Sequence, residues 1–184
     1  MIKHLRSDLA SHEGDWTRQG FWVMIVYRFG QWRYGISIGL MRKAASLIYK
    51  ILYKFIQIVA GVELPAEAPI GPRLRIDHFG GIIVSGYARL GSDCVLRQGV
   101  TIGLRHPSDP CAPQIGDRVD IGAGAKLLGS IRIGNDVTIG ANAVVISDIP
   151  DGATAVGIPA RVLQAKTSST KQEKPPQTLA VNGH

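Results

Sequence analysis

The stretch that decides the fold is IGDRVDIGAGAKLLGSIRIGNDVTIGANAVVISDIP, residues 115–150, which divides into six consecutive hexads. Each hexad begins with an aliphatic residue and carries a small or apolar residue at its fifth place. The leading residues are Ile115, Ile121, Leu127, Ile133, Ile139 and Val145, and the fifth-place residues are Val119, Ala125, Ile131, Val137, Ala143 and Ile149. A strict period of six matches neither an α-helix nor an alternating hairpin sheet. It is typical of a β-solenoid, in which each hexad supplies one short strand and one corner.

The same pattern extends toward the N-terminus. It occurs in LGSDCV and LRQGVT, residues 90–101, and earlier in IGPRLR and IDHFGG, residues 70–81, with a phase slip of two residues between Ile82 and Leu90. We expect the first and fifth residues of each hexad to point inward and to stack on their equivalents in the next coil. Because each coil buries its face only against its neighbours, the ends need caps. The N-terminal region and GIPARVL, residues 157–163, can supply them.

One segment interrupts the period. Thirteen positions separate Ile102 from Ile115, where twelve are expected, and the intervening GLRHPSDPCAPQ is polar and contains three prolines. We therefore predict a loop extruded from the solenoid at this point. Irregular loops on rigid scaffolds often carry function.

The composition divides the chain into three parts. Residues 1–62 are predicted to form an N-terminal helical region, and residues 63–162 form the solenoid domain. Residues 163–184 are polar, aperiodic and rich in residues that favour disorder, so they are predicted to form a disordered tail. The expected fold class is mainly β, a β-helix of hexapeptide repeats with helices in front of it.

The helical region contains a basic and largely apolar segment, LMRKAASLIYKILYKFIQIVAG, residues 40–61. Lys43, Lys50 and Lys54 recur at helical spacing within it. The lysines are too frequent for a membrane span. Two interpretations stay open: a helix that packs on partners and solvates one basic stripe, or a helix that lies in the membrane interface with its lysines toward anionic lipid.

The charge and the cysteines limit the function classes. The chain has 184 residues and a formal net charge of +7, which favours an anionic partner such as a phosphorylated cofactor or a membrane surface. No compact Lys/Arg run interleaved with aromatic residues occurs, so nucleic acid is not expected as a partner. Cys94 and Cys111 have no metal-type spacing and suggest no disulfide framework. The first residues contain no apolar segment typical of a signal peptide, so a cytoplasmic protein is expected.

Several motifs together resemble the serine O-acetyltransferase family of hexapeptide-repeat acyltransferases. They are DHFGGIIVSG (77–86), RQGVTIG (97–103), IGAGAKLLG (121–129), IGANAVV (139–145), AVGIPARV (155–162) and the helical GFWVMIVYRFGQW (20–32). The resemblance implies a left-handed parallel β-helix, an exception to the usual right-handed crossover. It also implies a homotrimer with active sites in the clefts between subunits, and it leaves open whether two trimers pair.

His78 and Asp77 are the catalytic candidates. His78 takes the third place of its hexad, so we expect it to point outward. The resemblance implies that His78 is the general base, because an alcohol is a poor nucleophile until a neutral imidazole takes its proton. For Asp77 three roles stay open: it orients the imidazole, contacts the acceptor amine or caps the turn.

Acetyl-CoA is the co-substrate that the resemblance implies. Ala123 and Ala141 match positions whose backbone contacts the pantetheine arm, and Gly103 and Leu104 begin the loop near the thioester. The backbone near Gly103 would stabilise the oxyanion. The same alanines are also compatible with simple tight packing of the coils.

Lys126 and Arg161 are candidates for charge pairing with the phosphates of CoA. Solvated surface charge is the alternative for both residues. No metal is expected. The γ-type carbonic anhydrases resemble this fold and hold zinc with three histidines, but His78 and His106 are the only histidines of the solenoid and its loop.

The residues that contact the acceptor in the family pattern are only partly present in this chain. The family carries a second active-site histidine just before the solenoid resumes, where this chain has Ala112, and His106 stands six residues earlier as a weak substitute. Asp15 is a weak stand-in for the acidic residue that holds the serine amine. The expected activity is acetyl transfer to L-serine. The alternatives are a sugar O-acetyltransferase of exopolysaccharide synthesis, acting peripherally at the inner face of the membrane, and a metal-binding or non-catalytic scaffold trimer.

Overall fold

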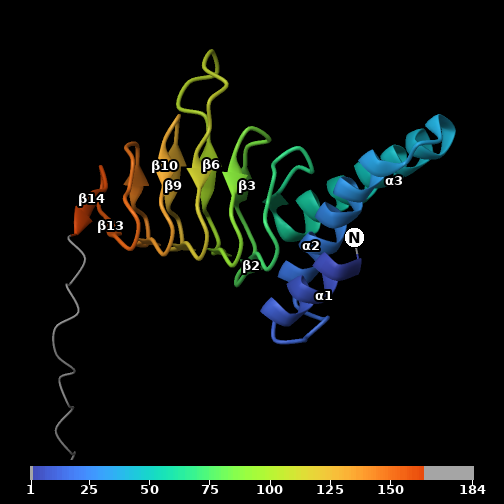
Figure 1. Ribbon diagram of the computed structural model, residues 1–184, viewed down its shortest axis with the longest axis horizontal. Helices are drawn as coiled ribbons and strands as arrows, with labels where there is room; N and C mark the ends of the chain where they lie inside the picture. Colours follow the sequence, from blue (N-terminus) through green and yellow to red (C-terminus); the bar gives the residue numbers. More distant parts are fainter. Residues whose placement is uncertain (1, 164–184) are drawn as a thin grey trace, which may run out of the picture.

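The computed structural model describes residues 2–163, in which three α-helices precede a long stack of short parallel strands (Figure 1). The helices are α1 (Ile2–Ser11), α2 (Gln19–Trp32) and α3 (Gly39–Ala60), and a short 3-10 turn, Arg33–Gly35, joins the last two. The expected N-terminal helical region is confirmed. The predicted disordered tail lies outside the described residues, except for Leu163.

The strands are two or three residues long and wind into successive coils. They are β1 (Val62–Glu63), β2 (Arg75–Ile76), β3 (Ile82–Val84), β4 (Arg89–Leu90), β5 (Val95–Leu96), β6 (Thr101–Gly103), β7 (Gln114–Ile115), β8 (Asp120–Ile121), β9 (Lys126–Leu128), β10 (Arg132–Ile133), β11 (Thr138–Ile139), β12 (Val144–Val145), β13 (Thr154–Val156) and β14 (Arg161–Leu163).

Three parallel sheets form the faces of the solenoid, and a coil contributes at most one strand to each sheet. Sheet A has the order β1-β3-β6-β9-β12, sheet B has β4-β7-β10, and sheet C has β2-β5-β8-β11-β13. The last strand, β14, pairs antiparallel with β13 and closes the C-terminal end of sheet C. This is the parallel β-helix that the six-residue period predicts.

The interior of the solenoid consists of the first and fifth residues of the hexads. All twelve of these side chains in residues 115–150 are buried, with exposed fractions of 5% or less. Each buried aliphatic side chain contributes about 1.5–3 kcal/mol to stability. The predicted inward positions are therefore confirmed, and they hold the corners of the coils in register.

The predicted loop is also confirmed. Residues 104–113 form no strand and extend away from the coils between β6 and β7 (Figure 1). The side chains from Arg105 to Cys111 are exposed, whereas Ala112 is buried at the point where the chain rejoins the solenoid. The earlier phase slip corresponds to the turn of residues 85–88, which separates β3 from β4.

A buried ion pair joins the helices to the first coil. Nε of Arg28 on α2 lies 2.8 Å from Oδ2 of Asp8 on α1. The same guanidinium donates to the carbonyl oxygens of Ile70 (3.1 Å) and Gly71 (2.7 Å), and Oδ1 of Asp8 accepts from the N–H of Arg73 (2.8 Å). A buried charge pair is tolerated when its remaining hydrogen-bonding capacity is also used, as it is here. The helices thus cap the N-terminal end of the solenoid.

The helix α3 contacts the rest of the chain along one side only. Ala45, Tyr49, Ile56 and Ala60 are buried on that side. Within residues 2–163, no helix combines the length and the apolar character that crossing a bilayer requires.

Candidate functional site

His78 lies in the turn that joins β2 to β3. Its side chain is exposed and forms no hydrogen bond with another described residue. Gly80 (φ 103°) and Gly81 (φ 67°) follow it in left-handed conformations that a β-carbon disfavours. These glycines let the chain turn back into β3, and the imidazole points away from the core, as its third place in the hexad predicts.

The imidazole faces a cavity of about 460 Å³. One wall comes from the first coil and the other from the start of α2. The lining residues are Thr17, Arg18, Gln19, Gly20, Ile76, Asp77, His78 and Phe79. A cavity of this size suits a small ligand.

Close contact between α2 and β2 builds the floor of this cavity. A β-carbon on Gly20 would lie 2.4 Å from the carbonyl oxygen of Ile76 and 2.8 Å from Nε2 of His12, so only glycine fits. Nε2 of the buried His12 is also 3.3 Å from the N–H of Ile76, and Nδ1 is 2.7 Å from the carbonyl oxygen of Asp8. Because a carbonyl can only accept, the proton is assigned to Nδ1, and Nε2 accepts from Ile76.

Asp77 is paired with arginines. Nε of Arg75 lies 2.7 Å from Oδ1 of Asp77 as an ion-pair contact, and Nη2 donates to Oδ2 at 3.3 Å. Nε of Arg97 lies 3.6 Å from the same carboxylate, and Arg97 also pairs with Asp120 in the next coil. Among the described residues no hydrogen bond joins Asp77 to the His78 ring. A role for Asp77 toward the acceptor stays a prediction.

The corner that carries His78 repeats down the solenoid. Sheet C aligns Ile76 with Leu96, Leu96 with Ile121, and Ile121 with Ile139. The residues two places further on in each coil are His78, Gln98, Ala123 and Ala141. The N–H of Gly124 donates to the carbonyl of Gln98, and the N–H of Asn142 to that of Ala123, both at 2.8 Å. With roughly 4.8 Å per coil, Ala123 and Ala141 lie about 10 and 14 Å from His78 along the axis.

The two candidate phosphate-binding cations lie near this corner. Nζ of Lys126 donates to the carbonyl oxygen of Gly99 (2.5 Å) and lies 3.1 Å from Oγ1 of Thr101, so in this structure it links neighbouring coils. Arg161 is exposed on β14, opposite Val156 at the C-terminal end of the corner. Binding of phosphate by either side chain stays a prediction.

The loop candidates lie at the C-terminal ends of the sheet A strands, opposite to the end where His78 lies. His78 precedes β3, whereas Gly103 ends β6 and Leu104 begins the loop, so the two groups are at opposite ends of the sheet A strands. His106 is exposed in the loop, and Leu104 packs against the core. Within one chain the structure therefore does not bring Gly103, Leu104 or His106 to the imidazole.

Asp15 lies beside the cavity without lining it. Its Oδ1 accepts hydrogen bonds from the N–H (2.8 Å) and the hydroxyl (2.6 Å) of Thr17, which does line it. The hydrogen bond from the Thr17 hydroxyl lowers the pKa of Asp15. Asp15 thus shapes the segment that leads into α2, and its contact with an acceptor stays a prediction.

The α2 wall of the cavity was not predicted from the sequence. Thr17, Arg18, Gln19 and Gly20 belong to no motif that we singled out, except that Gly20 begins the family-like helical segment. His12 gave no signal either, because its partner Ile76 is 64 residues away in the chain.

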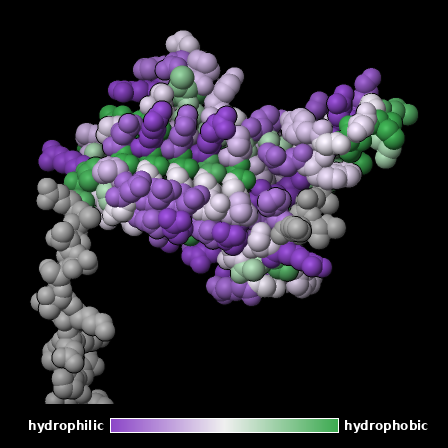
Figure 2. Space-filling model, in the orientation of Figure 1, coloured by the Kyte–Doolittle hydropathy of each residue, from purple (hydrophilic) through white to green (hydrophobic). Residues whose placement is uncertain are grey.

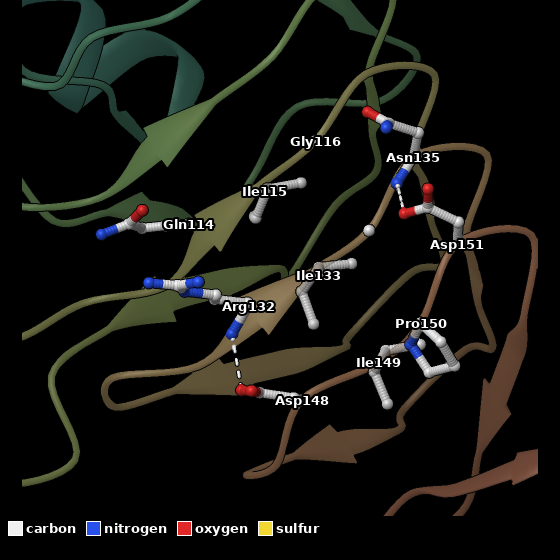
Figure 3. Close-up of a pocket in the computed structure, with 11 residues that line it drawn as sticks. Gln114, Ile115, Gly116, Arg132, Ile133, Asn135, Asp148, Ile149, Pro150 and Asp151 are labelled. Carbon is white, nitrogen blue, oxygen red and sulfur yellow. Dashed lines mark hydrogen bonds between the residues drawn. The ribbon is translucent and has the colours of Figure 1, made fainter.

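Another cavity, of about 760 Å³, lies on sheet B (Figure 3). Its polar side chains cap turns: Asp148 accepts from the N–H of Arg132 and Asp151 from that of Asn135, both at 2.8 Å (Figure 3). No histidine or cysteine lines it. The smaller cavity at His78 is the better candidate, because an exposed imidazole, a side chain able to act as a general base, lines it. No three His, Cys, Asp or Glu side chains in residues 2–163 gather as metal ligands would.

Comparisons with known proteins point to one family. The model of the bacterial transferase hexapeptide (six repeats) matches residues 112–147. A serine acetyltransferase of Mycobacterium tuberculosis is 40% identical over 139 residues, which cover 72% of this chain and 58% of that protein. A serine acetyltransferase of Helicobacter pylori is 39% identical over 137 residues, which cover 71% of this chain and 77% of that protein.

Solved structures agree with this comparison. A serine acetyltransferase in complex with CoA has a TM-score of 0.75 at 29% identity, covering 88% of this chain and 69% of that one. The Neisseria gonorrhoeae serine acetyltransferase in complex with serine has a TM-score of 0.73 at 32% identity, covering 87% and 68%. This chain thus spans about two thirds of those structures, and little more than half of the Mycobacterium protein.

Proposed function

The chain belongs to the serine acetyltransferase family, and from this premise we propose that it transfers the acetyl group of acetyl-CoA to the hydroxyl of L-serine. The observation that carries the proposal is the position of His78. Its exposed imidazole faces a cavity of about 460 Å³ and stands at the head of the corner that contains Ala123 and Ala141. Relatives with bound CoA and bound serine support this pair of substrates.

In the proposed mechanism His78 is the general base. The neutral imidazole takes the proton of the acceptor hydroxyl, and the oxygen attacks the thioester carbonyl. Backbone N–H groups near Gly103 stabilise the resulting oxyanion. The intermediate collapses to the O-acetyl ester, and the leaving CoA thiolate takes the proton back from the imidazolium. The route needs no acetyl-enzyme, and it would suit the cytoplasmic location expected from the sequence.

The pantetheine arm would follow the corner of the solenoid. Ala123 and Ala141 leave the backbone accessible there, because their side chains extend no further than a β-carbon. Arg161 at the C-terminal end offers an exposed guanidinium to the phosphates. Lys126 could join it only by giving up its present contact with Gly99.

A left-handed homotrimer would complete the site. His78 and the loop of residues 104–113 lie at opposite ends of the sheet A strands. A neighbouring copy would therefore have to bring its own loop to the His78 corner, as expected for active sites in the clefts between subunits. The separation of the two groups within one chain supports this assembly.

A sugar hydroxyl is the second candidate acceptor. The observation that favours it is Ala112, which is buried where the family pattern has its second histidine. Without that imidazole, selection for the small zwitterion serine would be weaker. The wall of Thr17, Arg18 and Gln19 would then decide which acceptor enters.

The test is release of the CoA thiol by the purified protein with L-serine, without acceptor and with a panel of glycans. The His78→Ala variant should lose roughly 10²–10⁴-fold in rate, with an unchanged melting temperature because the side chain is exposed. His4→Ala, an exposed histidine on α1 outside the cavity, is the matched control and should retain its rate. If CoA release depends on His78 and occurs with a glycan but not with L-serine, the acceptor is a sugar hydroxyl. Release that is independent of His78 would overturn the mechanism.

A further inference from the structure

The helix α3 has an apolar face that no described part of the chain covers. Leu40, Leu47, Ile48, Ile51, Phe55 and Ile58 are between 51% and 79% exposed. They lie on the side of α3 opposite to its buried residues. The helix projects beyond the end of the solenoid (Figure 1), and Figure 2 shows hydrophobic residues gathered at its far end.

A row of lysines borders this face. Lys43, Lys50 and Lys54 are seven and four residues apart, so they lie along one edge of the apolar side chains. Residues 16–62 contain seven Lys or Arg and no Asp or Glu, and the rest of the chain contains fourteen of each. The whole formal net charge of +7 therefore belongs to the region around α2 and α3.

A basic cavity of about 580 Å³ adjoins the apolar face. Arg33, Arg42, Lys43 and Lys50 line it together with the polar side chains of Tyr34 and Ser46, and Leu47 belongs both to this cavity and to the apolar face.

The charges of this cavity are not balanced. The buried Arg33 is fixed 3.2 Å from Glu67 and 4.1 Å above the ring of Tyr49. Arg42, Lys43 and Lys50 are exposed and form no ion pair within residues 2–163. Three free cations beside hydroxyl groups are suited to a phosphate group.

We propose that α3 lies in the surface of an anionic phospholipid bilayer. Its apolar face enters the boundary of the acyl chains, the lysines reach the headgroups, and the basic cavity takes a lipid phosphate. An interfacial helix combines these features: an apolar face with bulky residues, a basic polar edge and no acidic residues. The site would hold the enzyme at a membrane while His78 remains at the solenoid.

A second copy of the chain fits the surface less well. If two α3 helices packed antiparallel through this face, the lysine edges of the two helices would lie side by side. No acidic side chain in residues 16–62 could neutralise them, and like charges brought together oppose association. An anionic lipid surface supplies the missing negative charge.

The experiment is flotation of the full chain with vesicles of phosphatidylcholine alone or mixed equally with phosphatidylglycerol. We expect binding to the mixed vesicles only, and weaker binding in high salt. Lys50→Gln with Lys54→Gln should weaken partitioning by about 25-fold, since each lysine near an anionic surface contributes roughly fivefold. Arg89→Gln with Arg132→Gln removes the same charge from the solenoid and should bind as the parent does.

The apolar face is tested without changing charge. Ile51→Ser with Phe55→Ser should abolish flotation and leave CoA release and the mass in solution unchanged. Binding that persists in this variant, or equal loss in the solenoid control, would overturn the proposal. A change of oligomeric mass without lipid would assign the face to a second copy instead, and would overturn it as well. Soluble inorganic phosphate that fails to displace the protein from vesicles supports the lipid as the source of the phosphate.

Discussion

The main-chain N–H of Ile76 donates a hydrogen bond to Nε2 of His12, 3.3 Å away. His12 immediately follows α1, and Ile76 ends the strand two residues before His78. Since His12 is fully buried and its Nδ1 donates to the carbonyl of Asp8, the ring is a fixed link between the helical cap and the turn that carries His78. The N-terminal helices thus help to position the His78 turn.

Replacing His12 should therefore affect both stability and catalysis. In His12→Ala the N–H of Ile76 loses its acceptor in a buried position, which costs about 1–3 kcal/mol. We expect a lower free energy of unfolding in urea and a lower kcat with a smaller change in the KM for acetyl-CoA. His4→Ala, on the exposed side of α1, is the control. If both variants unfolded at the same urea concentration, the hydrogen bond between His12 and Ile76 would not stabilise the fold.

Gly20→Ala tests the close approach of α2 to the same strand. The added methyl group would lie 2.4 Å from the Ile76 carbonyl oxygen, so either the helix or the strand must move. Overpacking of this kind costs roughly 1–3 kcal/mol, and the shift should also widen the cavity at His78. Thermal unfolding and the KM for the acceptor measure the two effects. Gly39→Ala has open space around the new methyl group, and a drop in stability there as large as at Gly20 would contradict the steric explanation.

The ion pair of Asp8 and Arg28 should be strongly coupled. Asp8→Asn leaves the buried guanidinium without its countercharge, and breaking such a pair costs about 3–5 kcal/mol. A double-mutant cycle compares urea unfolding of Asp8→Asn, Arg28→Met and the variant with both changes. We expect the double variant to lose clearly less free energy of unfolding than the two single variants lose together. The exposed pair of Arg18 and Glu13 is the control, for which Arg18→Met should cost less than about 1 kcal/mol. Simple additivity at Asp8 and Arg28 would show that the two side chains act independently.

The two thiols should differ in reactivity. Burial raises the pKa of Cys94 to about 11, and a hydrogen bond with Asp109 raises the pKa of the exposed Cys111. Since the thiolate is the reactive form, labelling by iodoacetamide should be slow at neutral pH and should accelerate as the pH rises. Mass spectrometry should find label on Cys111 alone until the protein unfolds.

The same thiol tests whether acetyl transfer is direct. Cys111→Ser should retain full CoA release, because the proposed route forms no acetyl-enzyme. A rate that falls together with the loss of this thiol would instead indicate a covalent intermediate.

Sequence reasoning was most successful where one short-range rule applied repeatedly. The hexads predicted the inward positions, the extruded loop and the outward direction of His78, because a six-residue period leaves little choice as to which residues of a coil can face its axis. The alignment of Ala123 and Ala141 with His78 follows from the same period, once the sheets set which coils are neighbours.

The six-residue period could not predict the partners of Asp77 or the second wall of the cavity. Arg75 belongs to the same coil as Asp77, and Arg97 belongs to the next coil. Which arginine pairs with Asp77 depends on side-chain geometry, which a repeat pattern does not specify. Thr17, Arg18 and Gly20 reach the site because α2 docks on β2 through Gly20 and His12. No periodic signal connects these segments.

The sequence by itself determined the parallel β-helix, its buried residues and the corner that carries the imidazole, because burying one aliphatic side chain per short strand is a local requirement that repeats with every coil. Only the tertiary structure decided where the helices dock, which groups line the cavity at His78 and which face of α3 stays uncovered. Those features depend on contacts between segments tens of residues apart, and each is the result of shape and hydrogen bonding at one place in the fold.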